Sequence, residues 1–363
     1  MLLRNPFADA FGLEIGDLSI KLIRLKANGL FQGKGYNIKE QRIVDLPAGL
    51  IVNGEIQQPE LVRKKLLHIL GADGNRKFSK IKIPWVVAGL PEVKTFLKLI
   101  TVEGDPDGLT EDEIIFQAKK HLPFDIEEVY LNWQVVAVAA NLKHTQVLIG
   151  AIYKTTADTY TYLLESAMLT PIALEIEAVS LARSMITQSK DYHGEARAIL
   201  DLGATRSSLV IYDNNTIQFS TSLNFSGELV TMAIEQFLKI SHIEAEELKI
   251  KNGAKYNSKN AKYLRSITKI NSQLIDELQS ALKFYRDHFS NQNAVNHITM
   301  CGGMSRWVGL DNLISRKLKI AAHPGNPLKN LSSKKNPGKK GEALEMAVAI
   351  GLALRAAQKP FVI

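Results

Sequence analysis

The clearest indication of the fold is the stretch Gly12-Leu13-Glu14-Ile15-Gly16-Asp17-Leu18-Ser19-Ile20-Lys21, in which a glycine turn joins two apolar runs. The runs on either side have the hydrophobic pattern of paired strands. Gly16 lets backbone N–H groups approach phosphate oxygens, while Ser19 adds a hydroxyl donor and Lys21 a positive charge. The carboxylate of Glu14 is suited to hold a metal ion through water. Taken alone, this stretch also fits a plain hairpin.

A second unit of the same kind occurs later in the chain. The sequence Asp201-Leu202-Gly203-Ala204-Thr205-Arg206-Ser207-Ser208 repeats the order of acid, glycine and hydroxyl between predicted strands at 196–202 and 207–212. A further turn, Gly302-Gly303, follows a predicted strand at 297–301. Two facing hairpins can hold a phosphate chain, and a Gly-Gly turn can lie against a flat base. The repeated unit also indicates a fold of two related halves.

Composition and charge exclude several classes of protein. The 363 residues are 45% hydrophobic and 23% charged, which is typical of a globular chain with two or more domains. A net charge of +8 does not require nucleic acid, and we expect none as a partner. The single cysteine, Cys301, excludes an internal disulfide framework. No P-loop, nucleophile elbow or zinc motif occurs. Since no signal peptide or spanning segment is recognisable, we expect a cytoplasmic protein.

Other segments have recognisable patterns. We predict helices at 59–70 and from the N-cap Thr110 to about residue 122, two helices within 156–188 around a break at 169–171, a long amphipathic helix at 264–289 and a last helix at 342–357. A strand is predicted at 131–140, and a solvated lysine-rich loop at 323–341. The block at about 85–155 interrupts the larger pattern and is interpreted as an inserted subdomain.

These motifs together resemble the nucleotide-binding superfamily of actin, the heat-shock chaperones and hexokinase. Residues 14–21 are similar to its first phosphate hairpin, residues 201–205 to its second and residues 300–310 to its adenosine motif. Residues 175–183 and 342–354 are similar to its two connecting helices. The resemblance implies an α/β protein with the actin-like (ribonuclease H-like) duplicated two-domain fold around a nucleotide cleft.

Within this superfamily the chain is most similar to the PilM family of type IV pilus assembly proteins, relatives of the division protein FtsA. The similarity rests on LPAGLIVNGEI at 46–56, HLPFDIEEV at 121–129, SGELVT at 226–231 and AEELK at 245–249. It implies an ATP-binding (or ADP-binding) assembly factor with Mg²⁺, peripheral to the inner membrane and acting in twitching motility. The implied partner is the cytoplasmic N-terminal peptide of PilN, whose binding switches with nucleotide state. The resemblance also implies that other pilus platform proteins are partners and that the protein contacts the membrane only through its partners. A homo-oligomer is a further possibility that it implies.

The resemblance also implies roles for individual residues. Glu14 and Glu177 are the catalytic candidates, with Glu177 orienting the attacking water, and Glu14 and Asp201 would hold the metal through water. The implied nucleotide-binding residues are Gly16, Ser19, Lys21, Asp201, Gly203, Ala204, Thr205, Gly227, Glu246, Lys249, Gly302, Gly303, Met304 and Trp307. The alternatives are a helix-face salt bridge for Glu177, a solvated helix face for Glu246 and Lys249, and core packing for Met304 and Trp307.

The candidate partner surface is the corner Leu122-Pro123-Phe124, together with the predicted strand at 135–140, because extended tails bind to strand edges or apolar grooves. The alternative is that Phe124 caps a local core. Three departures from the superfamily pattern bear on turnover. Glu14 replaces the usual Asp, Asp17 adds a negative charge to the phosphate turn, and Ser226 replaces the first glycine of a pair. We therefore expect ATP to be bound far better than it is cleaved.

The predicted organisation has domain 1 at 1–190 with the subdomain at about 85–155, domain 2 at 195–330 with a lobe at about 225–295, and a C-terminal helix within 335–363 that returns to domain 1. Two other functions are open at this point. A small-molecule, sugar-type kinase of the same superfold needs a carboxylate aimed at a substrate hydroxyl, and no such residue is identified. A filament-forming protein like FtsA usually has a C-terminal amphipathic membrane helix, for which residues 358–363 are too short.

Overall fold

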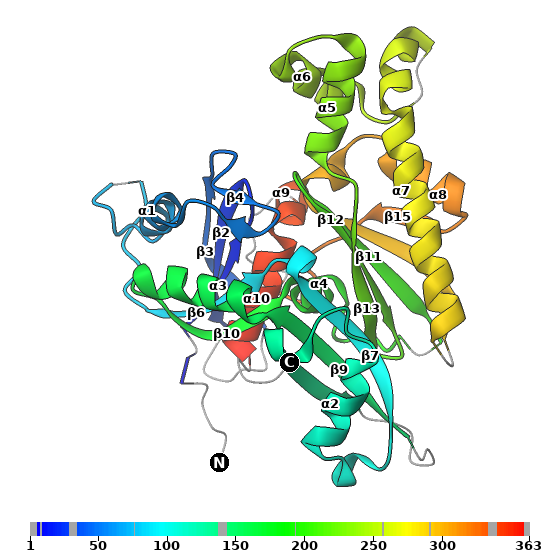
Figure 1. The fold of residues 1–363 in the computed structure, drawn as a ribbon. Coiled ribbons are helices and arrows are strands. Elements are labelled where there is room, and N and C mark those ends of the chain that lie inside the picture. The colour runs from blue at the N-terminus through cyan, green and yellow to red at the C-terminus, as the bar shows by residue number, and fades with distance from the viewer. Residues whose placement is uncertain are drawn as a thin grey trace.

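The computed structural model describes residues 6–7, 9–28, 35–75, 77–136, 144–192, 194–255, 258–289, 292–332 and 340–358. Two large sheets organise this part of the chain (Figure 1). The first sheet has the strand order β10-β6-β1-β2-β3. Its strands are β1 (Phe11–Ile15), β2 (Ser19–Ala27), β3 (Tyr36–Asp45), β6 (Trp85–Leu90) and β10 (Thr170–Ile176). The short strands β4 (Ile51–Val52) and β5 (Glu55–Ile56) pair separately.

The second sheet has the order β15-β14-β11-β12-β13-β7-β9-β8. Its strands are β7 (Thr95–Glu103), β8 (Val129–Val136), β9 (His144–Tyr153), β11 (Ala196–Leu202), β12 (Ser207–Asp213), β13 (Thr216–Leu223), β14 (Val295–Cys301) and β15 (Ala321–Pro324). In both sheets an antiparallel hairpin pairs in parallel with a later strand. β1 pairs with β2 and β6, and β11 pairs with β12 and β14. The prediction of two related halves is therefore confirmed.

Local sequence accounts for how the main helices begin. Pro59 occupies the first turn of α1 (Pro59–Ile69). Thr110 forms a capping box with Glu113 at the start of α2 (Glu111–Lys119). Ser226 accepts a hydrogen bond from the backbone N–H of Leu229 and caps α5 (Gly227–Leu238). This cap is a structural reason for a serine where the superfamily has a glycine.

Two helices with small residues lie between the sheets. α4 (Glu177–Met185) and α10 (Ala347–Gln358) pack on each other, and α10 also packs on β1. The approach is close enough that a Cβ added at Gly351 would collide with the backbone of Ser180, and one at Gly12 with the backbone of Ala353. These glycines allow the helices to approach the hairpin that bears the first phosphate turn.

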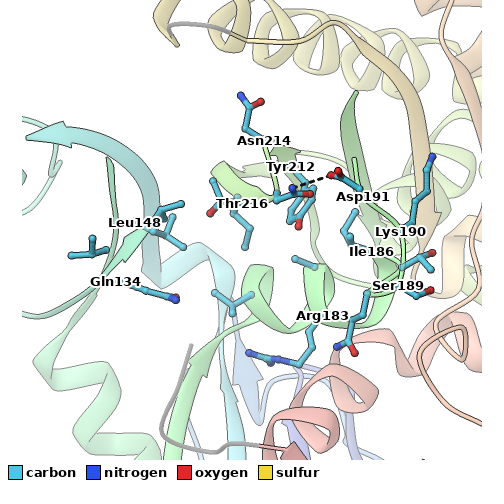
Figure 2. Close-up of a pocket in the computed structure, with 18 residues that line it drawn as sticks. Gln134, Leu148, Arg183, Ile186, Ser189, Lys190, Asp191, Tyr212, Asn214 and Thr216 are labelled. Atoms are coloured by element: carbon cyan, nitrogen blue, oxygen red, sulfur yellow. Dashed lines mark hydrogen bonds between the residues drawn. The ribbon is translucent and has the colours of Figure 1, made fainter. Parts of the chain in front are cut away.

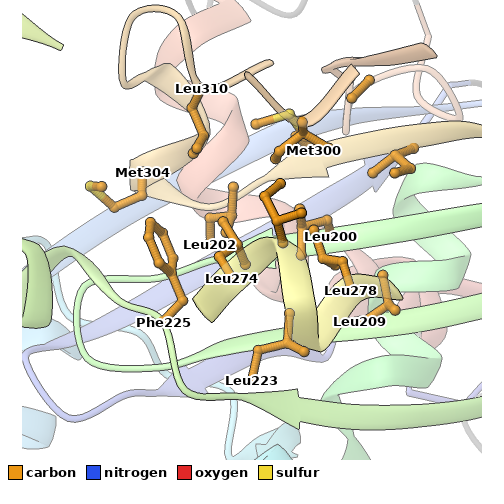
Figure 3. Packing of buried hydrophobic residues seen from close by; sticks show 14 of the residues in the cluster. Leu200, Leu202, Leu209, Leu223, Phe225, Leu274, Leu278, Met300, Met304 and Leu310 are labelled. Carbon is orange, nitrogen blue, oxygen red and sulfur yellow. The ribbon is translucent and has the colours of Figure 1, made fainter. Parts of the chain in front are cut away.

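The largest core cluster lies between the second sheet and its helices (Figure 3). Leu200 and Leu202 of β11 meet Leu274 and Leu278 of α7 (Ala261–His288) there. The lobe formed by α5, α6 (His242–Asn252) and α7 projects from this sheet in Figure 1. α8 (Leu310–Leu318) follows β14 after a 3₁₀ turn at Gly303–Arg306. A second cluster packs α1 and α3 (Lys154–Ser166) on the first sheet.

The structure corrects several predicted elements. Residues 170–176 form strand β10 between α3 and α4, so Glu175 and Ile176 are not helical, as expected for a short apolar run that pairs with β6. α2 ends at Lys119, earlier than predicted, and β8 begins at Val129. Residues 137–140 of the predicted strand lie outside the described residues, as does 333–339 of the predicted loop. The predicted last helix is divided into α9 (Lys340–Ala343), a 3₁₀ turn (Leu344–Met346) and α10.

The block between β6 and α3 extends the second sheet. β6 itself lies between β10 and β1 in the first sheet, whereas β7 pairs with β13 through Lys98 and Phe219. β9 and β8 continue the sheet beyond β7, and α2 packs on β7. An inserted subdomain thus remains a proposal, with 91–153 as the segment that leaves the first sheet.

Candidate functional site

A cavity of about 170 Å³ lies between the two hairpin turns that follow β1 and β11. Both catalytic candidates line this cavity, as do the predicted residues of both turns. They are Glu14, Gly16, Ser19, Lys21, Glu177, Asp201, Gly203, Ala204, Thr205, Gly302 and Gly303. We call this space the inner cavity.

A second cavity of about 530 Å³ adjoins it, and the two share Leu18, Ala204 and Gly303 in their walls. The remaining predicted nucleotide-binding residues, Gly227, Glu246, Lys249, Met304 and Trp307, line this outer cavity. The structure therefore brings every residue of the predicted nucleotide site together around two adjoining cavities. The inner cavity is small and lined by charged side chains, whereas the outer cavity is larger and has both apolar and charged side chains in its walls.

The first turn places a lysine against a glutamate. Lys21 Nζ donates to Glu14 Oε1 over 2.6 Å, and the Oε2 atom of Glu14 is buried with no hydrogen-bond partner. Burial opposes the charge on Lys21, but the carboxylate of Glu14 outweighs it and raises the pKa of Lys21. The turn itself is closed by the N–H of Gly16, which donates to the carbonyl of Ser19 over 2.9 Å.

The second turn is tied to the start of the lobe. The N–H of Gly203 donates to the carbonyl of Arg206 over 2.8 Å, and a Cβ at Gly203 would collide with that oxygen. Gly227 N–H donates to the Gly203 carbonyl over 3.1 Å, and Glu228 N–H to the Ala204 carbonyl over 2.8 Å. The N-terminus of α5 is thereby fixed to the turn, so the walls of the two cavities are connected by backbone hydrogen bonds.

The inner cavity has a donor set that suits a divalent cation. Burial, followed by the nearby charge of Glu14, raises the pKa of Asp201 to about 6. Such paired carboxylates are relieved by a bound cation. Within the described ranges no three His, Cys, Asp or Glu side chains cluster as a metal site. The orphaned oxygen of Glu14 and the buried Asp201 fit an ion held through water and ligand phosphates rather than by a full protein cage.

Glu177, the first residue of α4, lines the inner cavity. Burial, together with the carboxylates of Glu14, Glu92 and Asp201, raises its pKa to about 8 against the opposing effect of Arg206. The salt bridge considered for this position belongs to its neighbour instead. Glu175, at the end of β10, pairs with Arg183 of α4 and Arg355 of α10, each at 2.5 Å.

The polar pair of the outer cavity is organised around a buried amine. Lys249 Nζ donates to the carbonyl of Gly227, to Thr231 Oγ1 and to Glu246 Oε2 over 3.0, 2.8 and 2.6 Å. Lys249 is buried, so the solvated-face alternative does not hold for it, whereas the side chain of Glu246 is 42% exposed.

The apolar wall of the outer cavity also belongs to the core. Trp307 Nε1 donates to the carbonyl of Lys249 over 2.9 Å. Met304 and Trp307 pack in the large cluster and also line the cavity, so core packing and cavity lining both apply to them (Figure 3 shows Met304). At the shared wall, a Cβ added at Gly303 would meet no atom within 4 Å.

Asp17 and Arg206 are among the residues of the inner cavity that were absent from the predicted site. Asp17 Oδ2 and Oδ1 accept the N–H groups of Asn53 and Gly54, each over 3.0 Å. The guanidinium of Arg206 lies 3.7 Å from Asp17. The negative charge that Asp17 adds to the turn is therefore partly compensated by these contacts. The sequence does show one of these charged residues in each predicted turn, Asp17 in the first and Arg206 in the second. Nothing in the sequence around either turn indicates that the two residues pair.

A larger cavity lies on another part of the molecule. A cavity of about 940 Å³ is bounded by β8, by the end of α4 and by the β12–β13 hairpin, with Gln134, Ile186 and Thr216 in its walls (Figure 2). It shares Gln134, Leu148 and Val179 with a smaller cavity of about 220 Å³. We call these two spaces together the β8 groove.

The predicted corner lies apart from this groove. Leu122, Pro123 and Phe124 line neither of its cavities. Phe124 is half-buried and packs against Tyr153, with ring centroids 4.6 Å apart. Val135 of the predicted strand does line the larger cavity.

The chain is similar to one protein family over nearly its whole length. The family model "Type IV pilus assembly protein PilM" matches residues 12–357. The solved structure "PilM-PilN type IV pilus biogenesis complex" is similar with 24% identity and a TM-score of 0.80, over 97% of this chain and 100% of that chain.

Two further structures are similar at a TM-score of 0.52. MreB5 of Spiroplasma citri bound to AMPPNP has 14% identity over 95% of each chain. The ethanolamine utilization protein EutJ from Carboxydothermus hydrogenoformans has 12% identity over 95% of this chain and 89% of that one. These likenesses confirm the predicted actin-like α/β fold. Among the described helices, none has the length and apolarity needed to cross a bilayer.

Proposed function

The chain belongs to the PilM family of type IV pilus assembly proteins, and on this premise we propose that it binds ATP or ADP with Mg²⁺ and couples nucleotide occupancy to partner binding. The observation that carries the proposal is that all the nucleotide-binding residues expected from the sequence line the inner and outer cavities. The family assignment favours an assembly factor over a sugar-type kinase or an FtsA-like filament protein. Its action in twitching motility, from the cytoplasmic side of the inner membrane, belongs to the same proposal.

The two cavities divide the work of nucleotide binding. In the inner cavity, Lys21, the Ser19 hydroxyl and the glycine backbone can bind the phosphates. A bound Mg²⁺ would neutralise phosphate charge beside Glu14 and Asp201. In the outer cavity, the side chains of Trp307 and Met304 and the exposed carboxylate of Glu246 can contact the base and the ribose. Lys249 already satisfies three acceptors, so its role is to hold this wall in place.

Binding rather than rapid turnover is what the site supports. An orienting residue for water acts best as an ionised carboxylate, yet the pKa of Glu177 is raised to about 8. Most Glu177 side chains are therefore protonated near neutral pH before nucleotide enters. Together with the longer Glu14 in place of Asp, this favours a slow or absent ATPase.

A partner segment has a suitable surface in the β8 groove. PilM stands beside PilN in the similar pilus biogenesis complex, and we transfer that partner to this chain as a proposal. β8 is the last strand of its sheet, and the smaller cavity beside it is lined by apolar side chains such as Leu97, Leu148 and Ile176. An extended N-terminal peptide can add to such an edge and bury apolar side chains. Since Leu122-Pro123-Phe124 lines neither part, the groove is the better supported of the two docking surfaces.

Titration calorimetry with ATP–Mg²⁺ tests the proposal directly. Saturable binding with about one site per chain is the expected result, and a labelled N-terminal PilN peptide is expected to change its affinity when ATP is added. A chain that binds no adenine nucleotide at millimolar concentration would contradict the nucleotide site. A peptide affinity that is the same with and without nucleotide would contradict the switch alone.

A further inference from the structure

Arg206 is a cation in the inner cavity whose hydrogen-bonding capacity is only partly used. It follows Thr205 in the second turn, and its side chain is 15% exposed. Its Nη1 atom is buried and has no hydrogen-bond partner. Its Nη2 atom lies 3.7 Å from Asp17, which is an ion pair but longer than a hydrogen bond. A largely buried guanidinium with an unused N–H donor can donate hydrogen bonds to an anion.

The partners around Arg206 are engaged elsewhere. Asp17 already accepts the N–H groups of Asn53 and Gly54, so it stays satisfied if the guanidinium turns away. Lys21, the other cation of the cavity, is held by Glu14 at 2.6 Å. Arg206 is thus the cation that can move toward a ligand at the smallest cost in lost hydrogen bonds.

Arg206 lies in the inner cavity, away from the proposed base site. Ala204 and Gly303 line both cavities and mark the side where the base enters, whereas Arg206 lines only the inner cavity. Glu177 lines the same inner cavity and exerts a direct electrostatic influence on Arg206. A nucleotide whose base lies in the outer cavity would extend its phosphates into the inner cavity that Arg206 lines.

We propose that Arg206 binds the terminal phosphate of a nucleoside triphosphate and is the residue by which this site distinguishes ATP from ADP. The inference rests on the proposed nucleotide function and adds the selectivity of the site. A guanidinium presents two parallel N–H donors that match phosphate oxygens, and such charge-assisted contacts are strong where water is excluded. ADP lacks the group that Arg206 reaches, so it gains nothing from this side chain.

The test measures dissociation constants for ATP–Mg²⁺ and ADP–Mg²⁺ in three full-length proteins. They are the wild type, Arg206→Gln and Asp17→Asn. Asp17→Asn is the matched control, since it breaks the same ion pair but keeps the guanidinium. We expect the wild type to prefer ATP, Arg206→Gln to weaken ATP binding by about tenfold or more with less than about a threefold effect on ADP, and Asp17→Asn to retain the preference for ATP.

Each outcome has a distinct meaning. Equal losses of ATP and ADP affinity in Arg206→Gln, or a wild type without preference, overturn the role of Arg206 while the nucleotide site stands. Selective loss of ATP affinity in Asp17→Asn also overturns it, because the ion pair rather than the guanidinium would then be responsible. If the wild type binds neither nucleotide, the proposed function itself fails. Should Arg206→Gln not fold, Arg206→Lys replaces it, with the expectation of a smaller but still ATP-selective loss.

Discussion

Arg355, near the end of the chain, donates from Nη1 to Oε2 of Glu175 over 2.5 Å, although the two residues lie in α10 and β10. The other oxygen of Glu175 accepts Nη1 of Arg183 on α4 at the same distance. One buried carboxylate therefore joins the last helix to the first sheet and to the connecting helix. This contact supports the proposal that the C-terminal helix returns to domain 1.

The first prediction concerns Glu175→Gln. Removal of the charge leaves two arginines facing each other at a side chain that is 1% exposed, so we expect the free energy of unfolding to fall by about 3 kcal/mol or more at neutral pH. Burial opposes the charge of Glu175, but Arg183 and Arg355 outweigh it and lower its pKa. The stabilising effect is therefore present above the unfolded pKa of about 4.5 and is lost as pH falls through the folded value. Urea unfolding at neutral and acid pH measures both effects.

Glu195→Gln is the control for this measurement. Glu195 also pairs with two cations, Arg197 and Lys190, but its side chain is 34% exposed. Its loss should destabilise the fold far less than Glu175→Gln does, because solvent screens an exposed ion pair. Equal costs for the two substitutions would contradict the idea that Glu175 is a buried junction.

The second prediction is that a substitution at a glycine turn can abolish nucleotide binding without disturbing the fold. A Cβ at Gly303 meets no protein atom within 4 Å but enters the wall shared by the two cavities. We therefore expect Gly303→Val to fold normally and to lose most of its ATP–Mg²⁺ affinity in calorimetry. Gly203→Val is a poor probe, because its Cβ collides with the Arg206 carbonyl and will lower stability as well.

Gly108→Val serves as the matched control, since a Cβ there also meets nothing within 4 Å and the residue lines neither cavity. It should bind ATP as the wild type does. Undiminished binding by Gly303→Val would remove Gly303 from the nucleotide site.

The third prediction concerns turnover. Because a misplaced or protonated orienting group forfeits about 10²–10⁴-fold in rate, we expect steady-state hydrolysis of ATP to be well below about 1 s⁻¹ near neutral pH. A coupled assay of ADP release with saturating ATP–Mg²⁺ measures it. A rate of roughly 1 s⁻¹ or above would defeat this view, and a rate that depends on an added sugar would indicate a kinase.

The fourth prediction uses the raised pKa of Glu177. Between the unfolded value of 4.5 and the folded value of about 8, the folded state holds a proton that the unfolded state has lost. The free energy of unfolding must then decrease as pH rises through this interval. A glutamine side chain does not titrate, so Glu177→Gln should be more stable relative to the wild type at about pH 9 than at about pH 5.

Thermal unfolding of the nucleotide-free proteins in that pH range is the measurement. A stability difference between Glu177→Gln and the wild type that does not change with pH would show that Glu177 ionises in the fold as it does in water. That result would also weaken the argument for slow turnover.

The fifth prediction locates the partner surface. Val135 is 38% exposed and lines the β8 groove, so a charge there should disfavour an apolar peptide. We expect Val135→Glu to weaken binding of a labelled N-terminal PilN peptide by about tenfold or more in fluorescence anisotropy, with ATP binding retained. Val52→Glu, at a similar exposure of 44% outside the groove, is the control and should have little effect.

Phe124→Ala decides between the groove and the predicted corner. Loss of peptide affinity in Phe124→Ala but not in Val135→Glu would favour the corner at Leu122-Pro123-Phe124. Deletion of 85–155 is unsuitable for this purpose, because it would remove β6 from its place between β10 and β1 in the first sheet.

Much of the lining of the proposed nucleotide site could be predicted from sequence. Turn glycines, hydroxyls and acids recur at fixed spacing in residues 14–21, 201–205 and 302–303, because the backbone needs of a phosphate turn are local. The helix cap at Thr110 and the strand pairing within both hairpins could be predicted as well, because they too depend on residues close together in the sequence. The family motifs then indicated the actin-like fold as a whole.

Tertiary structure alone determined how the charged groups combine. The pairing of Asp17 with Arg206, the use of Glu175 rather than Glu177 in an ion pair, and the burial of Lys249 all join segments far apart in the chain. So does the pairing of β7 with β13, which places the predicted insertion in the second sheet. The state of a charge depends on which groups approach it and how much water they exclude, and neither is encoded in the spacing of residues along one strand or helix.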